Sequence, residues 1–202
     1  MAAYTPRVQQ AMQFAADLHA GRTRTITDAA FITHPLSVAL VLADAGVSGE
    51  DVLVAAVLHD VVEDEGVGKA EISVRFGERV GGLVEAMTEP EEDAAGDDLA
   101  WGDRKAHIVE LARSTEDSDV LALKAADLIC NATDLLGEHE RVGDAVFPRF
   151  EPQGGERQVG YYLDLAHALD GRPLPDALAG QVKWVIGSLD GLGSGAAHIA
   201  DP

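Results

Sequence analysis

Apolar residues recur every three or four positions along most of this chain, and this spacing limits its fold more than any other feature. The period matches one face of an α-helix, whereas the alternation typical of half-buried strands is scarce. The 202 residues are 47% hydrophobic, which suffices for one domain with a sizeable core. We therefore expect an all-α fold, with a single helical bundle over residues 1–189 and a flexible C-terminal tail at 190–202.

Glycine, proline and capping residues set the expected helix boundaries. Ser48 and Asp51 have the spacing of a capping box at a helix start, and Gly66 is the expected end of that helix. Residues 89–98, which are acidic and contain Pro and Gly, are typical of a mobile loop. The expected helices are about Thr5–His19, a helix with Pro35 in its first turn that ends at Gly46, Ser48–Gly66, Lys69–Phe76, Glu78–Met87, Trp101–Arg113, Asp119–Leu136 closed by Gly137, Gln158–Leu169 and Asp176–Leu189.

The formal net charge of -20 limits the partners of this chain. Nucleic acids and anionic membranes bind to clustered Lys and Arg, so we expect neither as a partner. A small anionic ligand stays compatible with this charge if a few arginines and a metal ion focus positive potential locally. No signal-peptide pattern or membrane-length apolar run occurs. Cys130 is the only cysteine, which favours the reducing cytoplasm. The oligomeric state stays open.

The stretch VLHDVVEDEG carries four ionisable side chains where an apolar helix should continue. In a helix, His59 shares a face with Glu63, and Asp60 shares the neighbouring face with Asp64. No Lys or Arg balances this charge anywhere between Asp51 and Gly68. The stretch therefore predicts a bound divalent cation.

A metal site needs ligands from other parts of the chain, and two residues qualify. His34 lies at a junction between a loop and a helix, and Asp127 lies in a helix whose neighbours are apolar. A carboxylate in such surroundings is expected to be buried, and it then needs a partner or a metal. Together with His59 and Asp60, these residues form a mixed nitrogen and oxygen set that suits Mn, Fe or Zn. The absence of thiolates argues against a structural zinc site.

These residues also resemble a known family, the HD superfamily of metal-dependent phosphohydrolases, through the series His34, His59-Asp60 and Asp127. The longer pattern is similar to the small alarmone hydrolases, which are single-domain relatives of the hydrolase half of the Rel/Spo enzymes. The resemblance covers roughly Thr5–Leu169. Its motifs are H-x-G-x-x-R at His19–Arg24, F-I-x-H-P at Phe31–Pro35, L-H-D-x-x-E-D at Leu58–Asp64, F-G at Phe76–Gly77, L-V-E-x-x-T at Leu83–Thr88 and A-D-x-x-x-N at Ala126–Asn131.

The resemblance implies an HD-domain helical bundle that removes the 3′-pyrophosphate from guanosine tetra- or pentaphosphate. It implies a divalent metal, first of all Mn²⁺, with Fe, Zn, Ni or Co as alternatives. Carried over by position, it implies three groups of residues: His34, His59, Asp60 and Asp127 as metal ligands, Glu63 and Asp64 to orient and deprotonate the attacking water, and Arg24 and Asn131 to hold the nucleotide.

Two other functions stay open. One is an HD-type nucleotidase that releases phosphate from another (deoxy)nucleotide, and the other is a non-catalytic nucleotide-binding sensor. Both Glu63 and Asp64 are present directly after the HD pair, which favours the pyrophosphohydrolase over either alternative. Two departures from the family pattern bear on specificity: Phe31 stands where Tyr is usual, and Leu128 stands where Lys or Arg commonly follows the metal-binding Asp.

Several residues also have ordinary structural explanations. Arg24 could lie on a loop surface, and Asn131 could bond a neighbouring helix end. One of Tyr161 and Tyr162 is expected in the core, although both could line a pocket mouth. Three basic residues are expected on the surface: Lys124, Arg104 and Lys105.

Overall fold

The computed structural model describes residues 4–62, 67–93 and 95–192, and within these ranges it is helical with no β-strand beyond two isolated bridges. This agrees with the expected all-α fold. None of the described helices is both long and apolar enough to span a membrane. The helices are α1 (Pro6–Leu18), α2 (Thr33–Asp44), α3 (Glu50–Leu58), α5 (Lys69–Phe76), α6 (Glu78–Met87), α7 (Trp101–Ser114), α8 (Ser118–Val142), the 3-10 helix η1 (Gly143–Phe150), α9 (Gly155–Leu169) and α10 (Asp176–Asp190).

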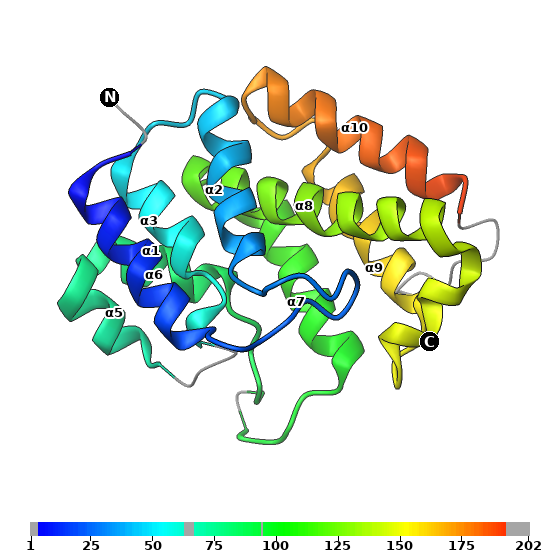
Figure 1. The fold of residues 1–202 in the computed structure, drawn as a ribbon, viewed down its shortest axis with the longest axis horizontal. Helices are drawn as coiled ribbons and strands as arrows, with labels where there is room; N and C mark the ends of the chain where they lie inside the picture. Colours follow the sequence, from blue (N-terminus) through cyan, green and yellow to red (C-terminus); the bar gives the residue numbers. More distant parts are fainter. Residues whose placement is uncertain (1–3, 63–66, 94, 193–202) are drawn as a thin grey trace.

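Two helices, α3 and α8, organise the core. Every residue of α3 from Val52 to Leu58 is buried, and α3 packs against α1, α2 and α6. The 25-residue α8 contacts α2, α6, α9 and α10. In Figure 1 the helices α1, α2, α3, α5 and α6 gather at one end of the molecule and α9 and α10 lie toward the other, with α8 joining the two groups. A residue on the inner face of α8 can therefore meet residues from both halves.

The start of α3 differs from the expected capping box. The residue before the helix is Gly49, and no side chain caps the first turn. The Asp51 carboxylate instead accepts a hydrogen bond from Arg7 Nη1 at 2.6 Å, and Glu50 Oε2 lies 3.1 Å from the same nitrogen. The helix dipole favours acidic side chains in the first turn of α3. The bonds from Arg7 also connect α1 with α3, and no capping box is present.

Helix α8 runs past its expected end at Gly137. It closes instead at Gly143, whose φ of 62° is the left-handed conformation that glycine adopts readily. The extra turns bury Glu138, which accepts a hydrogen bond from Arg141 Nε at 2.8 Å and lies 3.4 Å from Arg149 Nη2 of η1. Packing against η1 therefore outweighs the weak helix propensity of Gly137.

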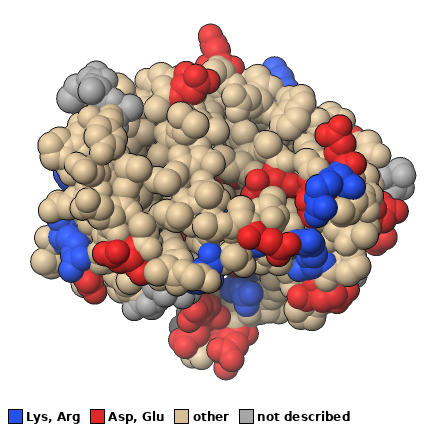
Figure 2. Space-filling view, in the orientation of Figure 1, with Lys and Arg blue, Asp and Glu red and all other residues tan. Residues whose placement is uncertain are grey.

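The acidic segment folds as a hairpin, named here the acidic hairpin (residues 89–99, of which 94 is not described). The Leu99 amide donates to the Glu91 carbonyl at 2.8 Å, and the Asp93 carboxylate accepts from the amides of Ala95 and Asp97. Figure 2 shows acidic side chains gathered at the bottom of the view, where the hairpin lies in Figure 1, with basic side chains just above them. The expected loop thus has its own hydrogen-bonded structure.

The expected tail lies almost wholly outside the described residues. Helix α10 ends at Asp190, and the described chain ends at residue 192. The division into a domain at 1–189 and a tail at 190–202 therefore stays a prediction.

Candidate metal centre

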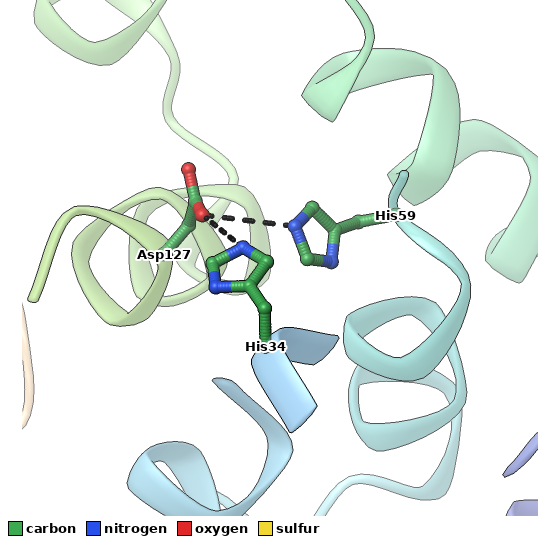
Figure 3. Close-up of side chains that lie close together, drawn as sticks. All are labelled: His34, His59 and Asp127. Atoms are coloured by element: carbon green, nitrogen blue, oxygen red, sulfur yellow. Dashed lines mark ion pairs between the residues drawn. The ribbon is translucent and has the colours of Figure 1, made fainter. Parts of the chain in front are cut away.

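Three of the predicted metal ligands meet at one point, and each comes from a different helix or its end. His34 lies in the first turn of α2, Asp127 lies within α8, and His59 directly follows α3. Their ligand atoms all lie within 4.8 Å of one another. His34 Nε2 is 3.0 Å and His59 Nε2 is 3.6 Å from Asp127 Oδ1. Figure 3 shows the two rings and the carboxylate converging on a common centre.

Asp60 adds a second carboxylate to this cluster. Its Oδ1 lies 3.1 Å from His59 Nε2, and its Oδ2 lies 3.7 Å from His34 Nε2. The structure therefore brings together the four side chains that were predicted as ligands. Two imidazoles and two carboxylates without a thiolate form a donor set for a divalent transition metal.

A hydrogen bond to the backbone sets the orientation of His59. Its Nδ1 lies 2.8 Å from the carbonyl oxygen of Ala56. Because a carbonyl oxygen only accepts, Nδ1 carries the proton, and in the neutral ring Nε2 presents its lone pair to the cluster. Metal-binding histidines commonly make this second bond, which fixes both the tautomer and the ring plane.

The structure differs here from the helix that was expected to continue through the HD motif. Helix α3 ends at Leu58, and residues 59 and 60 form a turn rather than a continuing helix. The contact between His59 and the Ala56 carbonyl occupies an acceptor in the last turn, which accounts for the end of the helix at this position. Glu63 and Asp64 lie outside the described residues, so their predicted role stays a prediction.

The buried Nε2 of His59 indicates what kind of ligand the cluster would bind. His59 Nε2 is buried and has no hydrogen-bond partner, although carboxylate oxygens of Asp60 and Asp127 lie near it. When the His59 ring is neutral, its Nε2 is a hydrogen-bond acceptor and faces carboxylate oxygens, which are also acceptors. Buried acceptors that face one another are unfavourable unless a cation lies between them. The residues present therefore fit a divalent metal ion.

Without a metal, protons provide the positive charge of the cluster. Burial alone lowers the pKa of His59, but the charges of Asp60 and Asp127 outweigh burial and hold this pKa well above 6.5. Burial raises the pKa of Asp60, yet the His59 charge lowers it to about 2. Burial also raises the pKa of Asp127, but the hydrogen bond with His34 and the charge of both rings hold it well below its ordinary value. A metal ion would therefore displace a proton from His59 on binding.

Asn131 and Arg24 form a hydrogen-bonded chain that ends at the cluster. The Asn131 amide nitrogen donates to Asp127 Oδ1 at 2.7 Å, and its oxygen accepts from Arg24 Nη2 at 2.6 Å. Arg24 also pairs with Asp134 at 3.0 Å. Asn131 thus orients a candidate metal ligand. Both Arg24 and Asn131 line the cavity described next, and their predicted contact with a nucleotide stays a prediction.

A cavity of about 230 Å³ lies over the four clustered side chains, all of which line it. Tyr161 and Tyr162 of α9 both line it and both are buried, so neither is confined to core packing alone. Phe31 also lines the cavity, and the guanidinium carbon of Arg24 lies 5.7 Å from its ring centroid. Leu128, the second departure from the family pattern, is an apolar part of the same wall.

Two lysines that were expected on the surface line this cavity instead. Lys124 is only 1% exposed, and the Lys105 side chain is 15% exposed. The surface prediction was wrong for both. Lys124 precedes Asp127 by three residues and so shares its helix face, a spacing from which its position could have been predicted. For Lys105 no such signal exists, because its place depends on how α7 packs against α9.

Proteins from several organisms are similar in sequence to more than half of this chain. The chain is 36% identical over 132 residues to a guanosine-3′,5′-bis(diphosphate) 3′-pyrophosphohydrolase of Aquifex aeolicus, covering 65% of this chain and 18% of that protein. It is 31% identical over 167 residues to the protein of the same name from Vibrio cholerae, covering 80% and 21%. It is 39% identical over 124 residues to a probable GTP pyrophosphokinase of Mycobacterium leprae, covering 61% and 15%. The chain thus spans about a fifth of the length of these relatives.

Solved structures share the fold over most of the chain. A metazoan ortholog of SpoT, described as hydrolysing ppGpp, superposes with a TM-score of 0.74 at 23% identity, covering 93% of this chain and 97% of that one. A protein of Listeria monocytogenes superposes with a TM-score of 0.63 at 33% identity, covering 76% and 99%. The sequence model of the HD domain matches residues 11–146, a span that contains His34, His59, Asp60 and Asp127. The chain therefore belongs to the HD domain family.

Proposed function

We propose that this protein is a metal-dependent pyrophosphohydrolase that removes the 3′-pyrophosphate from guanosine 3′,5′-bis(diphosphate)-type alarmones. The observation that carries the proposal is the meeting of His34, His59, Asp60 and Asp127 beneath a cavity with lysines in its wall. The names of the relatives from Aquifex aeolicus and Vibrio cholerae support the choice of substrate.

In this proposal the four clustered side chains hold one divalent ion, with Mn²⁺ first and Fe, Zn, Ni or Co as alternatives. A bound ion of this kind lowers the pKa of water and neutralises charge on a phosphate. Asn131 keeps the Asp127 carboxylate in place through its 2.7 Å hydrogen bond. We further propose a cytoplasmic location, which is the setting suited to a chain whose only cysteine is the free Cys130.

The proposed reaction is a hydrolysis at the phosphorus attached to the ribose 3′-oxygen. Water adds to this phosphorus, the bond from phosphorus to the 3′-oxygen breaks, and the products are pyrophosphate and a nucleoside 5′-diphosphate with a free 3′-hydroxyl. Glu63 and Asp64 orient the attacking water and one of them accepts its proton, while the leaving 3′-oxygen takes up a proton to become the free 3′-hydroxyl. Lys124 and Lys105 offset the negative charge of the substrate phosphates, since both line the cavity.

One assay tests the proposal. Purified protein loaded with Mn²⁺ is incubated with guanosine tetraphosphate and with a panel of deoxynucleoside monophosphates, and the released product is identified. We expect pyrophosphate from guanosine tetraphosphate. We expect Glu63→Gln to lower kcat by about 10²–10⁴-fold, the usual effect of removing a general acid or base.

The rival functions give different products in the same assay. Orthophosphate released from a deoxynucleoside monophosphate would identify a nucleotidase. Nucleotide binding without any product would identify a sensor. Glu92 provides the control, because Glu92→Gln removes a similar charge from the exposed acidic hairpin and should leave turnover unchanged.

A further inference from the structure

An ion pair between Lys105 and Glu89 occupies part of the cavity wall. The Lys105 ammonium contacts Glu89 Oε1, and both residues line the cavity, with side chains 15% and 18% exposed. Lys105 comes from α7, and Glu89 begins the acidic hairpin. Lys105 could attract an anionic ligand to the cavity, but in this structure its charge is paired with the Glu89 carboxylate.

Contacts other than this ion pair also connect the hairpin with α7. Arg104, the residue before Lys105, donates from Nη1 to the Leu99 carbonyl at 3.0 Å and from Nε to Glu89 Oε2 at 3.2 Å. Leu99 comes directly before the N-cap of α7, and its amide bonds the Glu91 carbonyl across the hairpin, so neither contact of Leu99 needs the Glu89 carboxylate. Lys105 is thus free to change partner while the hairpin stays attached.

Lys105 lies beside two aromatic rings in the cavity wall, apart from its contact with Glu89. Its Nζ lies 4.7 Å from the ring centroid of Tyr161 and 5.9 Å from that of Trp101, and neither residue belongs to the metal cluster. The candidate ligands come from α2, α8 and the turn after α3, whereas Lys105 and Tyr161 come from α7 and α9. Lys105 and Tyr161 thus belong to a part of the cavity wall that the candidate metal ligands do not form.

We propose that Lys105 binds a phosphate of the nucleotide remote from the bond that is cleaved, and that Glu89 holds Lys105 until this phosphate displaces it. This inference rests on the proposed function for the identity of the nucleotide. A phosphate carries more charge than a carboxylate and offers three acceptor oxygens, so it can replace Glu89 at the ammonium. Glu89 consequently lowers the affinity of the cavity for anionic nucleotides.

The test uses GDP, which carries a 5′-diphosphate but no 3′-pyrophosphate and so reports binding without turnover. The Kd for GDP is measured by calorimetry on the metal-loaded protein and on the variants Glu89→Gln, Lys105→Met and the double variant. We expect Glu89→Gln to tighten binding about fivefold and Lys105→Met to weaken it by a similar factor, the range typical of a partly exposed ion pair. In the double variant, Glu89→Gln should no longer tighten binding.

Glu92→Gln is the matched control, because it removes one negative charge from the same hairpin, as Glu89→Gln does, but at an exposed position. An equal gain in affinity in this control would show a long-range charge effect and overturn the proposal. So would an unchanged Kd in Glu89→Gln, equal tightening with and without Lys105, or no GDP binding in any protein. Circular dichroism identifies a misfolded Lys105→Met, in which case Lys105→Gln replaces it.

Turnover of guanosine tetraphosphate separates this proposal from the proposed function. If the wild-type protein binds GDP with the expected variant pattern but releases no pyrophosphate, the reaction assignment fails and the role of Lys105 stands. If pyrophosphate is released but Glu89→Gln changes neither KM nor the Kd for GDP, the reaction stands and the role of Glu89 fails.

Discussion

At the scale of single residues, the candidate site depends on how polar atoms are paired in a buried setting. The two imidazoles and two carboxylates could be predicted from the HD motif together with His34 and Asp127. The bond from His59 Nδ1 to the Ala56 carbonyl and the bond from Asn131 to Asp127 could not, because each depends on the final side-chain orientation. These bonds determine which atoms of the cluster face one another.

Asn131 should affect metal affinity although it is not itself a candidate ligand. In Asn131→Ala, Asp127 Oδ1 loses its 2.7 Å donor, and we expect the affinity for Mn²⁺ to fall about 10–100-fold, as when other outer partners of metal ligands are removed. Free Mn²⁺ measured by electron paramagnetic resonance gives the Kd.

Asp134→Asn is the control for Asn131→Ala. This change weakens the pairing of Arg24 but keeps the bond from Asn131 to Asp127, so the Mn²⁺ affinity should stay near that of the wild type. Wild-type affinity in Asn131→Ala would rule out the positioning role of Asn131.

The pKa of His59 predicts how metal affinity changes with pH. In the metal-free protein this pKa is raised well above 6.5, so the ring stays protonated at neutral pH and must lose a proton before its Nε2 can bind a metal. Mn²⁺ affinity should therefore rise as the pH increases above 6.5. Calorimetry in buffers of different ionisation enthalpy should also detect proton release. An affinity that stays constant over this range would contradict the protonated state of His59.

The same pKa shifts also make the stability of the metal-free protein depend on pH. A raised pKa of His59 contributes stability that is fully present below pH 6.5 and is lost as the pH rises through the pKa in the folded protein. The lowered pKa values of Asp60 and Asp127 contribute stability that is present above about pH 4 and is lost as the pH falls toward 2. The cluster therefore favours the metal-free fold most between about pH 4 and 6.5.

At the scale of helices, local signals predicted those boundaries that tertiary contacts do not alter. Helices α5 and α6 begin and end at the expected residues, because Gly77 between them adopts a φ of 96° that breaks the helix. The ends of α3 and α8 were predicted wrongly. In α3 a side-chain bond to a backbone carbonyl intervenes, and in α8 the burial of Glu138 against η1 carries the helix past Gly137.

Gly137 within α8 and Gly143 directly after it allow this explanation to be tested. Gly137 lies inside the helix with no atom within 4 Å of an added Cβ, so Gly137→Ala should stabilise the protein by roughly 0.5–1 kcal/mol. Gly143 ends the helix with a φ of 62°, so Gly143→Ala should destabilise it by about 1 kcal/mol. Urea denaturation measures both free energies of unfolding. The same sign for the two substitutions would show that α8 does not end at Gly143.

At the scale of the whole molecule, the candidate metal site joins parts of the chain that are far apart in sequence. His34 begins α2, His59 and Asp60 follow α3, and Asp127 belongs to α8. The family motifs predicted this meeting, but the part of the cavity wall formed by Lys105 and Glu89 could not be predicted. Its geometry depends on the packing of α7 and the acidic hairpin, for which no local pattern exists.

Because the site links α2, the end of α3 and α8, metal binding should stabilise the entire fold. At a free Mn²⁺ concentration of 100 times the Kd, linkage adds about 2.7 kcal/mol to the free energy of unfolding. For a chain of this size each kcal/mol raises the Tm by about 2–4 °C, so we expect a rise of roughly 5–11 °C over the protein in excess chelator. Differential scanning calorimetry measures it.

His34→Ala provides the control for this stabilisation. It removes one buried ring from the cluster, so its Tm should be nearly the same with Mn²⁺ and with chelator, whatever its own stability. An equal rise in the wild-type protein and in His34→Ala would place the stabilising ion elsewhere on this acidic chain. In that case the convergence of the two imidazoles and two carboxylates would need another explanation, such as an ion-paired cluster that holds the three helices together with protons alone.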